Sequence, residues 1–144
     1  MKINHIRIKN FRGYEDFEVS LNPNFNLFIG DNGSGKTAIL EALTVAIGSF
    51  FLGIKGADAR GFHKKDIRIA TFEHSVEFQF PVEVEAKGIV NQESITWLRS
   101  LNTDDERGQR RNRTTSKYAN SIKKIASRTD KAVRNGSNIN LPLI

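Results

Sequence analysis

The sequence predicts an α/β fold, and three observations carry this prediction. Segments near the amino terminus alternate polar and apolar residues, as half-buried strands do. A glycine-rich loop at residues 30–37 separates an apolar run from a second run with the spacing of a helix. Over residues 116–134, apolar side chains recur at helical spacing, which indicates an amphipathic helix. A chain of 144 residues is long enough to bury these elements around one core.

Strands are expected on both sides of the glycine-rich loop. Most of them alternate polar and apolar residues, which indicates an antiparallel sheet with one buried face. Residues 25–29 differ because they become continuously apolar, the pattern of a buried central strand. The expected strands are residues 3–8, 17–21, 25–29, 75–80, 83–85 and 93–101.

The glycine-rich loop fits the pattern G-x-x-x-x-G-K-[ST] of a phosphate-binding P-loop. Glycines permit a turn whose successive N–H groups form an anion nest, and the following helix adds its positive end. Lys36 is expected to reach the β- and γ-phosphates, and the Thr37 hydroxyl is expected to ligate Mg²⁺. The sequence therefore predicts ATP and Mg²⁺ as ligands, because the strand and helix context disfavours an accidental glycine-rich turn. The predicted nucleotide-binding residues of the loop are Gly30, Asp31, Asn32, Gly33, Ser34, Gly35, Lys36 and Thr37.

The helix expected after the loop, over residues 38–47, is apolar on most of its circumference. Such a helix is buried on more than one side. We expect a single P-loop NTPase lobe over residues 1–144, with an antiparallel β subdomain and a C-terminal amphipathic helix. Its expected parts are a nucleotide-binding core at 1–52, antiparallel strands at 53–101, and a basic loop, helix and start of a further strand at 102–144.

Positive charge is concentrated in the last quarter of the chain. Residues 1–106 carry 12 basic and 15 acidic side chains, whereas residues 107–144 carry 10 basic and one acidic. This segment is a candidate for contact with DNA or RNA phosphates. The alternatives are a solvated helix face with a charged loop, or a surface that pairs with acidic elements of another lobe. The candidate nucleic-acid contacts are Arg110, Arg111, Arg113, Lys117, Lys124, Arg128 and Lys131.

Several other classes of site find no support in the sequence. There is no cysteine, which excludes a disulfide framework and a cysteine-based zinc site. The three histidines have no metal-like spacing, and Trp97 is expected to serve packing. Residues 1–7 lack the apolar run of a signal peptide, and no stretch approaches the ~20 apolar residues of a membrane span. We therefore expect a cytoplasmic protein without a membrane partner.

Residues 6–14, I-R-I-K-N-F-R-G-Y, followed by the loop, resemble the opening of the RecF/SMC class of ABC-type ATPases. The likeness is strongest over residues 1–48. It implies the N-terminal lobe of an ABC-type head, with Arg12 and Asn10 lying against the nucleotide. The alternative for Arg12 is a surface arginine beside a strand end, and Phe11 is expected in the core. Residues 140–144 resemble the strand before the Q-loop of AAA-type defence ATPases, including those of Septu-like anti-phage pairs.

The resemblance also implies motifs that the sequence does not contain: a Q-loop, an L-S-G-G-like signature, a Walker B strand and a switch histidine. No catalytic residue is identified within the chain. We therefore expect an N-terminal fragment of a longer ATPase that hydrolyses ATP only with a C-terminal lobe and a second copy, as a homodimer of heads. Hydrolysis would be coupled to DNA binding or to a partner nuclease, in DNA repair or phage defence.

Two other classes of function stay open at this point. One is a P-loop enzyme of another type, such as a small kinase or a GTPase, although the absence of an N-K-x-D motif speaks against a GTPase. The other is a nucleic-acid-binding module that works through residues 107–134 and carries a vestigial loop.

Overall fold

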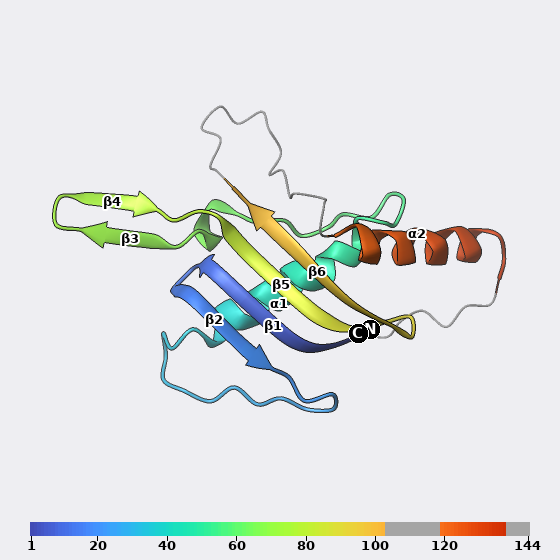
Figure 1. The fold of residues 1–144 in the computed structure, drawn as a ribbon, viewed down its shortest axis with the longest axis horizontal. Helices are drawn as coiled ribbons and strands as arrows, with labels where there is room; N and C mark the ends of the chain where they lie inside the picture. Colours follow the sequence, from blue (N-terminus) through green and yellow to red (C-terminus); the bar gives the residue numbers. More distant parts are fainter. Residues whose placement is uncertain (103–118, 138–144) are drawn as a thin grey trace.

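The core of the molecule is one sheet of four antiparallel strands (Figure 1). The computed structural model describes residues 1–102 and 119–137. The strands, in spatial order, are β2 (Tyr14–Ser20), β1 (Lys2–Phe11), β5 (Val82–Val90) and β6 (Glu93–Leu101). Because β1 pairs with β5, the strands expected at 83–85 and 93–101 extend the first sheet instead of forming a separate one.

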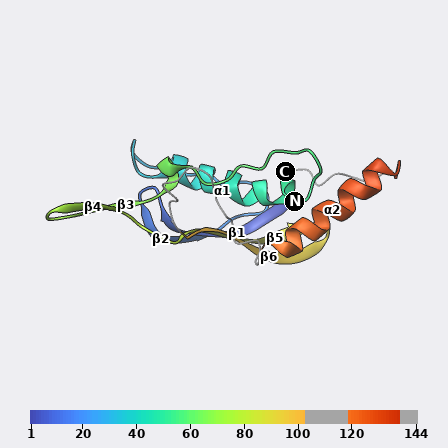
Figure 2. The ribbon, with the colours of Figure 1, turned by 90° about the horizontal axis from the view of Figure 1, so that it is seen from above.

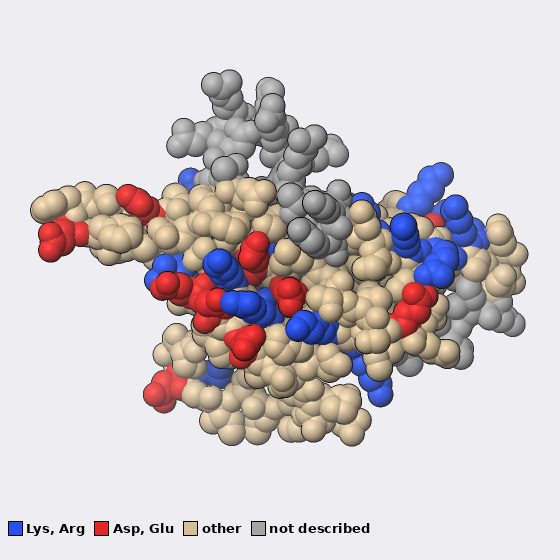
Figure 3. Space-filling view, in the orientation of Figure 1, with Lys and Arg blue, Asp and Glu red and all other residues tan. Residues whose placement is uncertain are grey.

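Alternation along the strands separates a buried face from an open face. Ile6 and Ile8 of β1 lie opposite Ala86 and Val84 of β5, and all four are buried. The residues between them are polar and lie on the other face, where Figure 3 shows basic and acidic side chains intermixed. The sheet is thus half-buried, as the alternating sequence pattern predicted.

Helix α1 (Lys36–Phe51) covers the buried face of the sheet (Figure 2). Trp97 of β6 is 1% exposed, and its indole Nε1–H donates to the Ala46 carbonyl oxygen at 3.0 Å. This contact confirms the packing role expected for Trp97. It also ties the middle of the helix to the edge strand through the polar group of a buried aromatic side chain.

Helix α1 is buried on more than one side, as the sequence predicted, because it packs against both the sheet and the second helix; a further side stays open. Leu40 is 54% exposed, and Leu43 and Ile47 are only partly buried. Together with Met1 and Phe25 they line an apolar groove of about 390 Å³. The helix therefore packs against the sheet and the second helix, and its remaining apolar side chains line this groove.

Residues 25–29 do not form the expected buried central strand. Phe25, Leu27 and Ile29 are 73%, 68% and 85% exposed, and no residue of this segment belongs to a strand. The physical reason is that no strand among residues 1–102 and 119–137 pairs with it, so its N–H and C=O groups have no ladder to join.

A hairpin of two strands projects from one end of the molecule (Figure 1). Its strands are β3 (Ile69–Phe72) and β4 (Ser75–Phe78). The sequence predicted the second strand but not the first. A 3-10 turn at Lys64–Asp66 precedes the hairpin.

Helix α2 (Asn120–Arg134) packs its apolar stripe against α1 and β6. Ile122, Ile125 and Ala126 are buried, as the helical spacing predicted. The helix ends before Gly136, whose φ of 78° is the left-handed conformation typical of a residue just past a helix end. In the part of the chain that the structure describes, no helix is long and apolar enough to cross a bilayer.

Candidate nucleotide-binding site

The P-loop leads directly into the first turn of α1. Gly35 precedes the helix with φ 92° and ψ 1°, and Gly33 has φ 87°. Residues other than glycine rarely adopt these backbone conformations, so glycine at both positions lets the loop turn sharply. The turn leaves the free N–H groups of the helix start at the mouth of the loop, where an anion is favoured.

Lys36 holds the loop together from within. Its ammonium group donates to the carbonyl oxygens of Gly30 (2.6 Å) and Asp31 (2.7 Å) and to Ser34 Oγ (3.3 Å). An ammonium has three N–H donors, so these contacts use all of them. A phosphate that binds Lys36 must therefore compete with the loop's own oxygens.

The loop borders a cavity of about 320 Å³. The cavity brings the end of β1 next to the start of α1, although 20 residues or more separate them in sequence. Thr37 is exposed at its rim, and its hydroxyl makes no hydrogen bond to any residue that the structure describes. The lining residues are Arg12, Gly13, Asn32, Gly33, Gly35, Lys36, Thr37 and Ala38.

Tyr14 supports the loop from β2, a role that the sequence analysis missed. Its hydroxyl donates to the Ser34 carbonyl oxygen at 3.3 Å, and its ring stacks on Phe17 with centroids 4.7 Å apart. A Cβ added to Gly35 would lie 2.7 Å from Tyr14 Cζ. Gly35 is thus required both by its φ and by the tyrosine ring against it.

Arg12 belongs to a cluster of two arginines and two carboxylates. Its Nη2 lies 2.7 Å from Glu41 Oε2 of α1, and its Nε donates to Asp66 Oδ1 at 3.3 Å. Arg60 Nη2 contacts the same two carboxylates, at 2.6 Å and 3.2 Å. Asp66 is fully buried. No pattern in the sequence points to Arg60 and Asp66, because the cluster joins residues 19 and 54 positions apart and includes a contact within an irregular segment.

Asn10 does not line the cavity. Its side-chain amide donates to the Pro81 carbonyl oxygen at 3.0 Å, and the residue is 8% exposed. Its own carbonyl accepts from Arg68 N at 2.9 Å. The structure therefore gives Asn10 contacts that fix the end of β1, whereas the resemblance implied contact with the nucleotide. Phe11 beside it is fully buried, as expected.

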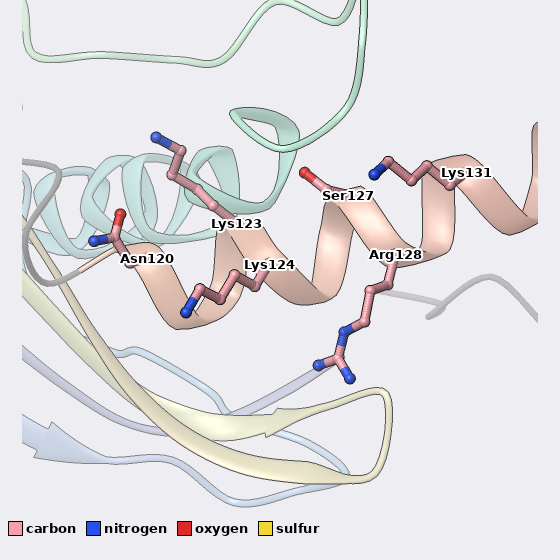
Figure 4. A pocket seen from close by; sticks show the side chains of 6 residues that line it. All are labelled: Asn120, Lys123, Lys124, Ser127, Arg128 and Lys131. Atoms are coloured by element: carbon pink, nitrogen blue, oxygen red, sulfur yellow. The ribbon is translucent and has the colours of Figure 1, made fainter.

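The basic face of α2 forms a second feature, separate from the P-loop (Figure 4). A shallow cavity of about 460 Å³ runs along it. Arg128 is paired with Glu93 at 2.8 Å, whereas three lysines of this face have no carboxylate partner among residues 1–102 and 119–137. Arg110, Arg111, Arg113 and Lys117 lie outside the described residues. The lining residues are Asn120, Lys123, Lys124, Ser127, Arg128 and Lys131.

Comparison with known proteins identifies the family. The model of the AAA domain family matches residues 5–144, which is nearly the whole chain. The chain belongs to this AAA domain family. The match spans the P-loop, the four-stranded sheet and α2, so it includes every element that positions the cavity.

The curated relatives of this AAA domain include DNA replication and repair proteins RecF. The RecF of Lactococcus lactis subsp. cremoris (strain MG1363) is 54% identical over 43 residues, 30% of this chain and 12% of that protein. The RecF of Chlamydia caviae is 56% identical over 45 residues, 31% of this chain and 12% of that protein. The RecF of Actinobacillus pleuropneumoniae serotype 5b is 43% identical over 53 residues, 37% of this chain and 13% of that protein. The matches thus span about an eighth of these relatives' length.

A solved structure has a similar fold. It is described as "Structural biochemistry of ATP-driven dimerization and DNA stimulated activation of SMC ATPases". The TM-score is 0.54 at 19% identity, over 88% of this chain and 80% of that one. These findings confirm the α/β fold and the predicted likeness to the N-terminal lobe of RecF/SMC-type P-loop ATPases. The narrower likeness to Septu-type defence ATPases stays a prediction.

Proposed function

We propose that this AAA domain is the ATP·Mg²⁺-binding lobe of a RecF/SMC-like ATPase. The observation that carries the proposal is the cavity in which Lys36, Thr37 and Arg12 converge at the start of α1. The glycines, the free N–H groups of the helix start and two cationic side chains make this cavity suited to polyphosphate. Asn32 to Lys36 would hold the phosphates, and Arg12 would add a second cation from the turn between β1 and β2.

The Thr37 hydroxyl fits a magnesium ligand, because it is exposed at the rim and has no competing partner among the described residues. Mg²⁺ prefers oxygen ligands and commonly binds through one or two protein groups together with substrate phosphates. Magnesium bound there would neutralise charge that develops on the phosphates. The role left to this chain is to bind and orient the nucleotide.

Hydrolysis would need residues from elsewhere. The sequence contains no Walker B strand, whose carboxylates would support the metal and position the attacking water. We propose that a C-terminal lobe and a second copy complete the site, and that ATP joins two heads. The names of the relatives refer to DNA replication and repair, and that of the structural neighbour to ATP-driven dimerization and DNA. Coupling to DNA or to a partner nuclease, in repair or phage defence, belongs to the same proposal.

Titration calorimetry with ATP and Mg²⁺ tests the proposal directly. We expect binding by the wild-type chain, strong loss of affinity in Lys36→Ala, and little change in Lys87→Ala, which removes an exposed lysine from β5. Thr37→Ala should lose the dependence of affinity on Mg²⁺, and Thr37→Ser should keep it. Equal affinity in wild type and Lys36→Ala would refute the proposal, and rapid ATP turnover by the chain alone would refute its incomplete site.

The basic face of α2 favours a second candidate, a nucleic-acid-binding module. Three lysines without carboxylate partners among the described residues lie along one groove, where they can neutralise backbone phosphates. Replacing Lys123, Lys124 and Lys131 by alanine should reduce the slope of log affinity against log salt by about three. The matched control replaces Lys2, Lys9 and Lys87 on the sheet. Salt-sensitive binding that survives Lys36→Ala would favour this candidate over the ATP-binding lobe.

A further inference from the structure

We infer that Arg60 and Asp66 are positioning residues for Arg12, and that through Arg12 they set the affinity of the P-loop cavity for ATP. The inference rests on the proposed ATP site. Arg60 and Asp66 lie outside the P-loop, in a segment that the P-loop motif does not include. Neither of them lines the cavity, so both must act through the arginine that does.

The two carboxylates of the cluster are each shared by two arginines. Asp66 accepts from Arg12 Nε at 3.3 Å, from Arg60 Nη2 at 3.2 Å and from the backbone N–H of His63 at 2.9 Å. Glu41 lies 2.7 Å from Arg12 Nη2 and 2.6 Å from Arg60 Nη2. These four side chains carry two positive and two negative charges, and the buried Arg99 adds a third cation close enough to Arg60 to interact with it electrostatically. The fully buried Asp66 carboxylate, with three donors, is well fixed.

This arrangement occupies one edge of the Arg12 guanidinium and leaves the other free. The Nε and Nη2 groups face the carboxylates, whereas Nη1 makes no hydrogen bond to any residue in the described ranges. The backbone is held as well, because Arg12 N donates to the Asp66 carbonyl oxygen at 2.7 Å. Arg12 has φ 53°, a backbone conformation that a residue other than glycine adopts when the surrounding structure enforces it.

Arg60 is itself anchored by the packing of its segment against α1. A Cβ added to Gly48 of the helix would lie 3.0 Å from the Arg60 carbonyl oxygen, so the two backbones are in close contact. If Arg60 is removed, both carboxylates are left with Arg12 alone. They then draw its guanidinium toward themselves and leave a net negative charge beside the cavity. Both effects oppose the binding of phosphate.

A double-mutant cycle separates positioning from a simple charge effect. Calorimetry with ATP and Mg²⁺ on wild type, Arg12→Ala, Arg60→Ala and the double variant gives the coupling. Arg60→Ala should weaken ATP binding by about threefold to tenfold. In the Arg12→Ala background it should cause no further loss, because the residue through which it acts is gone. A field effect of the lost charge would persist in that background.

Arg60→Lys keeps the charge but cannot bridge two carboxylates in the same way. Positioning therefore predicts a loss close to that of Arg60→Ala, whereas a field effect predicts wild-type affinity. Asp66→Asn should also weaken binding only when Arg12 is present. Arg68→Ala is the matched control, since Arg68 pairs with the exposed Glu15 outside the cluster and should bind as wild type does.

The outcomes distinguish this inference from the proposed function. The positioning role alone is overturned if wild type binds ATP through Lys36 but Arg60→Ala still weakens ATP binding in the Arg12→Ala background. That role is also overturned if Arg12→Ala leaves ATP affinity unchanged. Wild type that does not bind ATP overturns both. If Arg60→Ala melts at a much lower temperature than wild type, the cycle is run with Arg60→Lys, which retains the charge in the cluster.

Discussion

Replacing Gly35 by alanine should damage nucleotide binding far more than it damages the fold. The residue has φ 92°, where a Cβ costs about 1–2 kcal/mol. The new Cβ would also lie 2.7 Å from Cζ and 2.8 Å from Cε2 of the Tyr14 ring. Displacing Tyr14 from Phe17 and from the Ser34 carbonyl adds about 1 kcal/mol. The sum of about 2–3 kcal/mol corresponds to a roughly 30- to 150-fold loss of ATP affinity.

The cost should fall on binding because the loop is exposed and can change shape while the sheet and α1 stay folded. Calorimetry with ATP and Mg²⁺ measures the affinity, and a thermal melt of the same sample measures the fold. We expect a large loss in the first and a small shift in the second. ATP affinity within twofold of wild type would refute the argument, since neither the strained φ nor the clash would then constrain the bound loop.

Gly33→Ala provides the matched control for this prediction. Gly33 has a similar φ of 87°, but a Cβ there meets no atom within 4 Å. It should suffer the backbone cost alone and bind ATP more tightly than Gly35→Ala does. Tyr14→Ala removes the tyrosine contacts by itself, so in the Tyr14→Ala background Gly35→Ala should cost the backbone term alone. If Gly35→Ala costs as much in that background as in wild type, the clash with Tyr14 is not part of the cost.

Three further predictions concern stability. Trp97→Phe should lower the free energy of unfolding by about 1–3 kcal/mol in chemical denaturation, because the buried indole hydrogen bond to the Ala46 carbonyl is lost and the smaller ring leaves a cavity; an unchanged midpoint would contradict this. Leu27→Ser should change stability by less than about 0.5 kcal/mol, since the side chain is 68% exposed, and a loss above about 1 kcal/mol would show that it is packed. The hydrogen bonds from Arg7 hold the pKa of Asp16 below its usual value. The pair therefore stabilises the fold at pH values above the pKa of Asp16 in the unfolded chain, and this stabilisation is lost as the pH falls through the pKa of Asp16 in the folded chain. Denaturation below about pH 5 should therefore show less acid destabilisation in Asp16→Asn than in wild type, and equal acid sensitivity would refute the link.

The elements that the sequence predicted well are those whose signal is local. The P-loop pattern located the cavity, and alternation located β1 and β2 to within a few residues. Helical spacing predicted α1 and α2, with Gly136 just past the end of the second. In each case the signal lies in neighbouring residues of the sequence, either as the period of the apolar side chains or as a glycine in a tight turn.

The predictions that failed depended on contacts between distant segments. The apolar run at residues 25–29 has the composition of a buried strand, but a strand also needs neighbours, and none of the described strands pairs with it. The nucleotide contact that the resemblance implies for Asn10 stays a prediction; the structure adds a hydrogen bond from its amide to Pro81, 71 residues away, which no local pattern indicates. The cluster around Arg12 joins the turn after β1, α1 and the segment before β3, so no single stretch of sequence contains it.

The P-loop of this chain is anchored on one side by a helix, but the segment before it is exposed. A P-loop is normally anchored on both sides, by the strand before it and the helix after it. Here α1 anchors one side, while residues 25–29 before the loop have no strand partner in the described part of the chain. The loop's shape therefore depends on Lys36, which binds three of its oxygens, and on Tyr14, which holds Ser34. If phosphates bind there, as proposed, they would compete for that same lysine, and the hydrogen bond from Tyr14 to the Ser34 carbonyl would be the side-chain contact left to the loop among the described residues.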